Sequence, residues 1–326
     1  MKVLSSALDA VFAAPPRLAS ACVRYGALLL IGLVLACSRG GPAADASGEA
    51  EAAAESEGPG ANGGLRVDVT PEDSAIFDET MAWAREQRLD TLEIGSIMAA
   101  VGQRFVGKPY IPKTLDPPGP ERLIVNLREF DCVTYVESML AFGRVIRAGE
   151  DDFGAFIREL RDIRYRNNGD ADYADRLHYF SEWIASNDAK GIVRDITPSL
   201  GGVPDTSRID FMSQHADLYW QLAEPANVDA VRRTETELSA LPRTVIPESR
   251  IADAAPEIRD GDVIAAATTI EGLDIVHTGL ALWVDGKLHL MHAPLVGTVT
   301  QISELPLAER IQDIEKQDGI MVARPL

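Results

Sequence analysis

The chain has 326 residues, with 31 Lys and Arg against 50 Asp and Glu, three cysteines and a formal net charge of −19 at pH 7. This acidic excess repels phosphate backbones, so the sequence predicts no nucleic-acid partner. With 46% hydrophobic and 25% charged residues, the composition is that of a globular protein, not of a disordered chain or a polytopic membrane protein. Three cysteines cannot form a disulfide framework, so burial must hold the core together.

The N-terminal segment has the pattern of a targeting signal. Lys2, Arg17 and Arg24 precede an apolar run over residues 25–36, which is shorter than the roughly 20 residues that a membrane-spanning helix needs. The run ends in VLACS, which resembles the lipobox of bacterial lipoproteins and makes Cys37 the expected lipidation site. The alternative is an ordinary secretory signal with an incidental cysteine. In both cases the protein is expected to be exported.

The composition divides the rest of the chain into a tether and a globular part. Residues 39–64 contain no Val, Ile, Leu, Phe or Trp, and such a segment cannot bury a core. We therefore expect a lipoprotein signal peptide over residues 1–36, a disordered Ala/Gly/Glu linker over 37–64 and one domain over 65–326. Acyl chains on Cys37 would anchor the protein to the cell envelope, with the outer membrane as the expected destination.

Helical patterns dominate the first half of the domain. Apolar residues recur at helical spacing over residues 71–87, 94–105 and 153–160. Between the second and third of these patterns, the proline-rich segment 109–120 must be a loop. Residues 165–250 mix polar and aromatic residues without a clear period, so no elements are predicted there.

Another helix is predicted to begin at Cys132. Asp131 is a good N-cap residue, and residues 132–147 contain no proline and keep Cys132, Tyr135 and Met139 on one stripe. The sulfur of Cys132 is therefore expected at the N-terminus of a helix.

After residue 261 the pattern changes to short strands, predicted over residues 262–268, 275–284, 287–293 and 319–324. Asp285-Gly286 lies between two of these segments and is a strong signal for a two-residue hairpin turn. Helices followed by strands, without βαβ alternation, indicate an α+β domain with an antiparallel sheet.

The register of this hairpin follows from its turn. Counting outward from Asp285-Gly286, Gly279 lies opposite His292, so His277 and His292 share a face as diagonal neighbours roughly 7 Å apart. Gly279 has no side chain and leaves room between the two rings. His289 points to the opposite face, which argues against a zinc site built from the three histidines, because ligands must converge on one point.

Cys132 becomes the only free thiol once Cys22 leaves with the signal peptide and Cys37 carries lipid. A free cysteine is usually a small buried hydrophobe. A thiol at a helix N-terminus together with two imidazoles on one face can also form a Cys-His nucleophile. The helix dipole and a nearby imidazolium predict a lowered pKa for this thiol, and N–H groups at the helix start could hold an oxyanion.

Several short motifs occur in a characteristic order over residues 75–326. The motifs are GKPY (107–110), VNL (125–127), FDCVTYVE (130–137), RLHY (176–179), FM (211–212), DVI (262–264), VHTGLA (276–281) and LMHA (290–293). Together they resemble the N-acetylmuramoyl-L-alanine amidase-like family, a branch of the NlpC-type cysteine amidases that act on bacterial cell-wall peptides.

The resemblance implies a papain-like fold with helical insertions and a catalytic triad of Cys132, His277 and His292, without metal or organic cofactor. It places Tyr110 at the substrate, although a core tyrosine after a turn is an equally good reading. His178 would line a pocket that the insertion builds, or would only satisfy a buried hydrogen bond, which is the reading we favour. Asp131 is more simply a helix cap than a catalytic acid.

The expected activity is hydrolysis of the amide bond between N-acetylmuramic acid and L-Ala in peptidoglycan fragments, through a thioester on Cys132. One alternative keeps the triad and cleaves the bond between γ-D-Glu and the diamino acid. A second alternative is a non-catalytic wall-binding lipoprotein. Binding alone does not need the three triad residues, which disfavours the second alternative.

Overall fold

The computed structural model describes residues 66–166, 172–295 and 298–326, which belong to one compact unit. The predicted signal peptide, the linker and the lipidation site Cys37 lie outside the described residues. Within the described part, no helix combines the length and apolar character that crossing a bilayer requires.

The helices predicted in the first half are present, with ends that differ from the predicted ones by a few residues: α2 (Pro71–Glu86), α3 (Ile94–Arg104), α4 (Cys132–Ala148) and α5 (Phe153–Arg164). α4 begins at Cys132, as predicted, and ends at Gly149, whose φ of 71° suits the left-handed cap. It packs against α3, α5 and the main sheet and is buried on most sides. α4 is therefore the central helix of the fold.

The described part of the segment without a sequence pattern, 165–250, contains two longer helices, α6 (Phe180–Ala189) and α8 (Pro225–Ala240), joined by shorter elements. The single-turn 3₁₀ helices and three-residue strands among these are too short to produce a hydrophobic period. The shorter helix and strands are α7 (Phe211–Gln214), β3 (Val193–Asp195), β4 (Val203–Asp205) and β5 (Arg243–Pro247).

The predicted antiparallel sheet is confirmed, so the domain is α+β. In the described part its strands run in the order β4-β5-β10-β6-β7-β8-β9, with β3 paired to β10, and every pairing is antiparallel. The strands not yet bounded are β6 (Val263–Thr268), β7 (Ile275–Val284), β8 (Lys287–His292), β9 (Gln301–Ile302) and β10 (Gln317–Pro325). A separate parallel pair is formed by β1 (Val67–Asp68) and β2 (Leu123–Ile124).

The predicted hairpin register is also confirmed. Val284 pairs with Lys287 and Leu280 with Met291, and both turn residues have positive φ, as a type I′ turn requires. At the other end of β7 the register against β6 shifts, since Ala266 pairs with His277 but Ala267 pairs with Ile275. The pattern did not predict this bulge, which lies directly before His277 and can re-aim its side chain.

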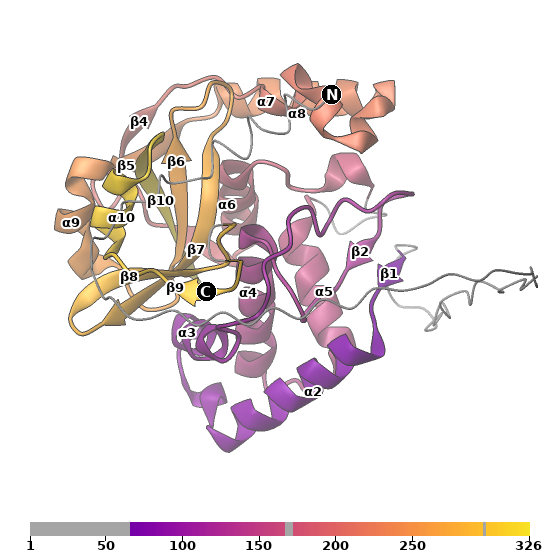
Figure 1. The fold of residues 1–326 in the computed structure, drawn as a ribbon, viewed down its shortest axis with the longest axis vertical. Coiled ribbons are helices and arrows are strands. Elements are labelled where there is room, and N and C mark those ends of the chain that lie inside the picture. The colour runs from indigo at the N-terminus through magenta and orange to yellow at the C-terminus, as the bar shows by residue number, and fades with distance from the viewer. Residues whose placement is uncertain (1–65, 167–171, 296–297) are drawn as a thin grey trace, which may run out of the picture. The chain divides into compact units, whose positions relative to one another are not determined.

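Helices cover both faces of the sheet (Figure 1). Along β6 the side chains alternate between two cores: Val263 and Ala265 join the cluster formed with α2–α6, whereas Ile264 and Ala266 join the cluster on the other face. That second cluster includes residues of α9 (Ile251–Ala254) and α10 (Leu307–Asp313). The α4 side of the sheet carries the larger core.

Candidate active site

The two histidines of the β7–β8 hairpin contact each other directly. Nε2 of His277 lies 2.6 Å from Nδ1 of His292, which is hydrogen-bonding distance, and the ring centroids are 4.9 Å apart. His289 points elsewhere, and its Nδ1–H donates to the Ser303 carbonyl at 2.8 Å. The hairpin therefore couples one pair of imidazoles and excludes the third.

Gly279 makes this pairing possible. A Cβ built on Gly279 would lie 2.8 Å from the Met291 carbonyl oxygen and 2.9 Å from Cβ of His292. Contacts this short would force β8 or the His292 side chain to move. The sequence predicted that Gly279 leaves room between the two rings. The close approach of β8 shows that the backbone also requires a residue without a side chain at this position.

The start of α4 is held by a capping box. The Asp131 carboxylate accepts from the N–H groups of Val133 at 3.1 Å and Thr134 at 2.8 Å, and the Thr134 hydroxyl accepts from the Asp131 N–H. Asp131 is thus a helix cap, as predicted. The cap occupies two N–H groups of the first turn, those of Val133 and Thr134. The N–H of Cys132 does not take part in it.

Thr278 connects Cys132 with the hairpin. Its hydroxyl donates to the Cys132 carbonyl at 2.8 Å, and hydrogen bonds from Thr278 also act on the thiol. Because Thr278 directly follows His277, the contact between β7 and α4 lies one residue from the first histidine. Cys132 as a residue keeps an intermediate exposure, although its thiol lies in surroundings buried enough to raise its pKa.

The ionisation of the thiol differs from the sequence-based expectation. Burial and then the Asp131 carboxylate raise the pKa of the Cys132 thiol to about 11, and the hydrogen bonds from Thr278 offset only part of this. Burial and the charge of Arg310 lower the pKa of His277 to about 3. The prediction of a lowered thiol pKa is therefore wrong, because burial of the thiol and the Asp131 carboxylate together outweigh the hydrogen bonds from Thr278.

Burial also lowers the pKa of His292, and the charges of His277 and Arg310 act in the same direction. Nε2 of His292 and Nε of Arg310, which lies on α10, are buried without a hydrogen-bond partner among the described residues. A neutral His292 can keep Nδ1 as an acceptor for the N–H of His277. The sequence did not indicate Arg310, because its effect depends on how α10 packs on β8.

The structure brings Tyr110 to the start of α4. The N–H of Ile111 donates to the Phe130 carbonyl at 3.0 Å, and the Phe130 N–H donates back to Pro109 at 3.0 Å. Burial and the charges of Cys132 and Asp131 raise the pKa of Tyr110. The phenol is thus close enough to Cys132 for their charges to interact.

The loop that follows Tyr110 is hydrogen-bonded through Asp116 to residues 172–250, the segment that we call the insertion. The Asp116 carboxylate accepts from the Arg176 guanidinium and from the Gln221 side-chain amide, and its carbonyl accepts from Trp220 Nε1. Sequence reasoning placed Arg176 in a motif without giving it a role. Its partner lies 60 positions away, so only the folded chain shows the contact.

His178 lies among structural partners. Its Nε2–H donates to the Tyr173 carbonyl at 2.7 Å, and its ring contacts that of Tyr173 at an interplanar angle of 48°, with the centroids 4.4 Å apart. Burial and the charge of Arg176 hold its pKa well below the ordinary value. This geometry matches the reading in which His178 satisfies a buried hydrogen bond.

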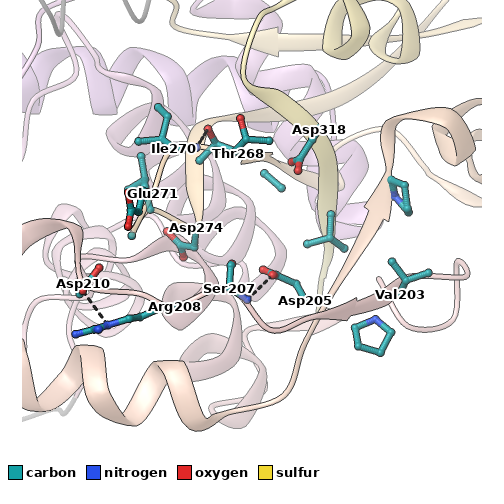
Figure 2. Close-up of a pocket in the computed structure, with 17 residues that line it drawn as sticks. Val203, Asp205, Ser207, Arg208, Asp210, Thr268, Ile270, Glu271, Asp274 and Asp318 are labelled. Atoms are coloured by element: carbon teal, nitrogen blue, oxygen red, sulfur yellow. Dashed lines mark hydrogen bonds and ion pairs between the residues drawn. The ribbon is translucent and has the colours of Figure 1, made fainter.

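A cavity of about 440 Å³ lies where the insertion meets the β6–β7 loop, the loop that leads into the strand of His277. Figure 2 shows the side chains that line it, which include more carboxylates than cations. Two of the carboxylates are already paired, Asp205 with Arg243 and Asp210 with Arg208. In the part of the chain that the structure describes, no group of three His, Cys, Asp or Glu is arranged to hold a metal ion.

Comparison with known proteins places the fold in a family. A family model described as N-acetylmuramoyl-L-alanine amidase-like matches residues 100–320. A crystal structure of an N-acetylmuramoyl-L-alanine amidase from Bacteroides uniformis is 35% identical with a TM-score of 0.69, over 72% of this chain and 100% of that one. No curated protein matches the chain.

Two further solved structures are similar. One, called a putative xylanase from Bacteroides fragilis, is 34% identical with a TM-score of 0.65, over 69% of this chain and 99% of that one. The other, from Legionella pneumophila, is 19% identical with a TM-score of 0.57, over 78% of this chain and 97% of that one. The second similarity concerns the fold alone.

Proposed function

Because the chain belongs to the N-acetylmuramoyl-L-alanine amidase-like family, we propose that it is a cell-wall amidase with Cys132 as nucleophile and His277 as base. The substrate is a peptidoglycan fragment, and the bond cleaved joins the lactyl group of N-acetylmuramic acid to L-Ala. The observation that carries this proposal is the contact between His277 and His292 at 2.6 Å, one residue from the link between Thr278 and Cys132.

The first half of the reaction transfers the acyl group to sulfur. The Cys132 thiol is neutral at rest, so His277 takes its proton as the sulfur attacks the lactyl carbonyl carbon. The developing oxyanion is stabilised by the backbone N–H of Cys132, which the Asp131 cap leaves. His277 then gives the proton to the departing amine of L-Ala, and a thioester remains on Cys132.

The second half regenerates the enzyme. Water attacks the thioester carbonyl, His277 takes a proton from that water, and the sulfur leaves and recovers a proton from His277. Nδ1 of His292 accepts the Nε2–H of His277 throughout, so Nδ1 of His277 is the nitrogen that exchanges protons with sulfur and substrate. The products are the free muramoyl sugar and the intact peptide.

Two broader parts of the proposal concern fold class and location. The helix-borne cysteine, the antiparallel sheet and the two paired histidines support placing the domain among the papain-like, NlpC-type amidases.

The lipobox at Cys37 supports export followed by lipid anchoring in the bacterial cell envelope. Metabolic labelling with a radioactive fatty acid should label the wild-type protein, and a Cys37→Ser variant should lose the label.

The bond choice is tested by digesting purified muropeptides with residues 65–326 and weighing the products. The amidase releases a sugar and an intact peptide. The alternative cut after γ-D-Glu would release a sugar that still carries a dipeptide. Absence of any product would contradict the enzymatic proposal and favour a wall-binding role.

A further inference from the structure

Trp220 is an exposed indole held in a fixed orientation. Its exposed fraction is 45%, one of the largest among the bulky hydrophobic side chains, yet its Nε1–H donates to the Asp116 carbonyl at 3.1 Å. An exposed tryptophan gains little stability from burial. A tryptophan that is held by one hydrogen bond and keeps nearly half of its surface exposed offers aromatic surface to a ligand.

The loop that orients Trp220 also contacts the start of α4. The Thr114 hydroxyl donates to the Asp131 carboxylate at 2.9 Å, and Lys113 Nζ donates to the Leu218 carbonyl at 3.1 Å. Thr114 and Asp116 are two positions apart, so their Cα atoms lie at most about 7 Å from each other. These contacts therefore link Trp220 Nε1 to the Asp131 carboxylate at the helix start over at most roughly 18 Å.

The chemistry of the surroundings indicates which part of a substrate fits here. A pyranose ring has an apolar face of C–H groups that stacks on an aromatic ring. The cavity beside the β6–β7 loop has no aromatic residue among its lining side chains and is rich in carboxylates, so it offers no such surface. A disaccharide attached through its lactyl group at the helix start would extend along the loop that links Asp131 to Trp220.

We propose that Trp220 forms a sugar subsite, in which its indole face stacks on a pyranose ring of the glycan part of the substrate. This inference rests on the proposed amidase function, because it assumes that the muramoyl group is bound at Cys132. Trp220 is then a specificity-determining residue that distinguishes glycan-bearing substrates from free peptides.

The test compares a Trp220→Ala variant with a matched control. Trp283 is 36% exposed, and its Nε1–H likewise donates to a backbone carbonyl, that of Ile258 at 2.9 Å. With a disaccharide-peptide substrate, Trp220→Ala should raise KM about 10-fold with little change in kcat. Trp283→Ala should leave both constants unchanged, and Trp220→Phe should restore most of the loss.

A binding measurement separates the two proposals. Isothermal titration of a Cys132→Ala protein with the disaccharide alone should show binding that disappears when Trp220→Ala is added. Unchanged disaccharide affinity and unchanged KM in the Trp220 variants would overturn the sugar subsite while leaving the amidase intact. Disaccharide binding that depends on Trp220, in a protein that hydrolyses no muropeptide, would support the subsite and refute the amidase.

Discussion

The two proposed catalytic histidines lie on one β-hairpin, whereas the loop from Tyr110 to Asp116 is held by residues far away in sequence. His277 and His292 are brought together by strand pairing across a two-residue turn. The loop depends on Arg176, more than fifty positions away. The hairpin therefore follows from local rules, whereas the position of the loop depends on contacts with residues far away in sequence.

On the proposals above, the hairpin serves the chemical step and the loop from Tyr110 to Asp116 serves substrate selection. The hairpin supplies the proposed base and its positioning partner, which any cysteine amidase of this kind would need. The loop supplies Tyr110 and, through Asp116, the orientation of Trp220. Changes in the hairpin should therefore affect kcat, and changes in the loop should mainly affect KM.

The largest effect is expected at the reacting residues. Cys132→Ala or His277→Ala should lower kcat about 1,000-fold or more, because each removes a group that bonds to the reacting atoms or exchanges protons with them. His289→Ala is the matched control on the same hairpin and should keep its activity. Loss of activity in the His289 variant, or retention in either of the others, would contradict the assignment.

A smaller loss of activity is expected when a side chain is introduced at Gly279, between the two strands of the hairpin. Gly279→Ala places a methyl group 2.9 Å from Cβ of His292, so the ring of His292 should move away from His277. We expect kcat to fall about 10- to 100-fold with KM nearly unchanged. Steady-state kinetics with a muropeptide checks this, and an unchanged kcat would show that the histidine contact is dispensable.

Changes in the loop from Tyr110 to Asp116 should show the opposite kinetic effect, on KM more than on kcat. Asp116→Ala removes the acceptor for Arg176 and Gln221, which we expect to cost about 1–3 kcal/mol of stability and to loosen the loop. KM should rise several-fold while kcat changes less. Limited proteolysis should cleave the variant between residues 110 and 120 sooner than the wild type, and equal cleavage rates would contradict this role for Asp116.

The smallest expected effect is a dependence of stability on pH. The folded thiol of Cys132 has a pKa of about 11 against an ordinary value of 9.0. The unfolded chain therefore deprotonates first, and the stability from this group is fully present below pH 9 and lost as the pH rises towards 11. Urea unfolding of wild type and Cys132→Ser across this range should show a weaker loss in the variant.

The hairpin was predictable because its side chains obey a period of two and its turn residues have a conformational reason to be there. The central helix was predictable because Asp131 marks its start and residues 132–147 contain no proline and keep an apolar stripe. Residues 165–250 were not, since their three-residue strands and single 3₁₀ turns leave no period, and the long helix α8 buries only Val231, Glu235 and Leu238. The bulge before His277 and the partners of Asp116 depend on tertiary contacts that no local pattern contains.

The pKa of Cys132 shows a further limit of local reasoning. A helix N-terminus favours a thiolate, but the strength of that effect depends on burial and on the charges nearby. The Asp131 carboxylate that caps the helix is the same group that disfavours the thiolate. One residue therefore helps the helix to start and opposes ionisation of its first side chain.

The central claim is that Cys132 carries the muramoyl group during turnover. Rapid acid quenching of the wild type with a muropeptide, followed by mass analysis of the peptide containing Cys132, tests it directly. The account predicts an added mass equal to the N-acetylmuramoyl acyl group on Cys132, without any amino acid attached. An adduct that retains L-Ala and D-Glu, or rapid turnover with Cys132 never modified, would contradict it.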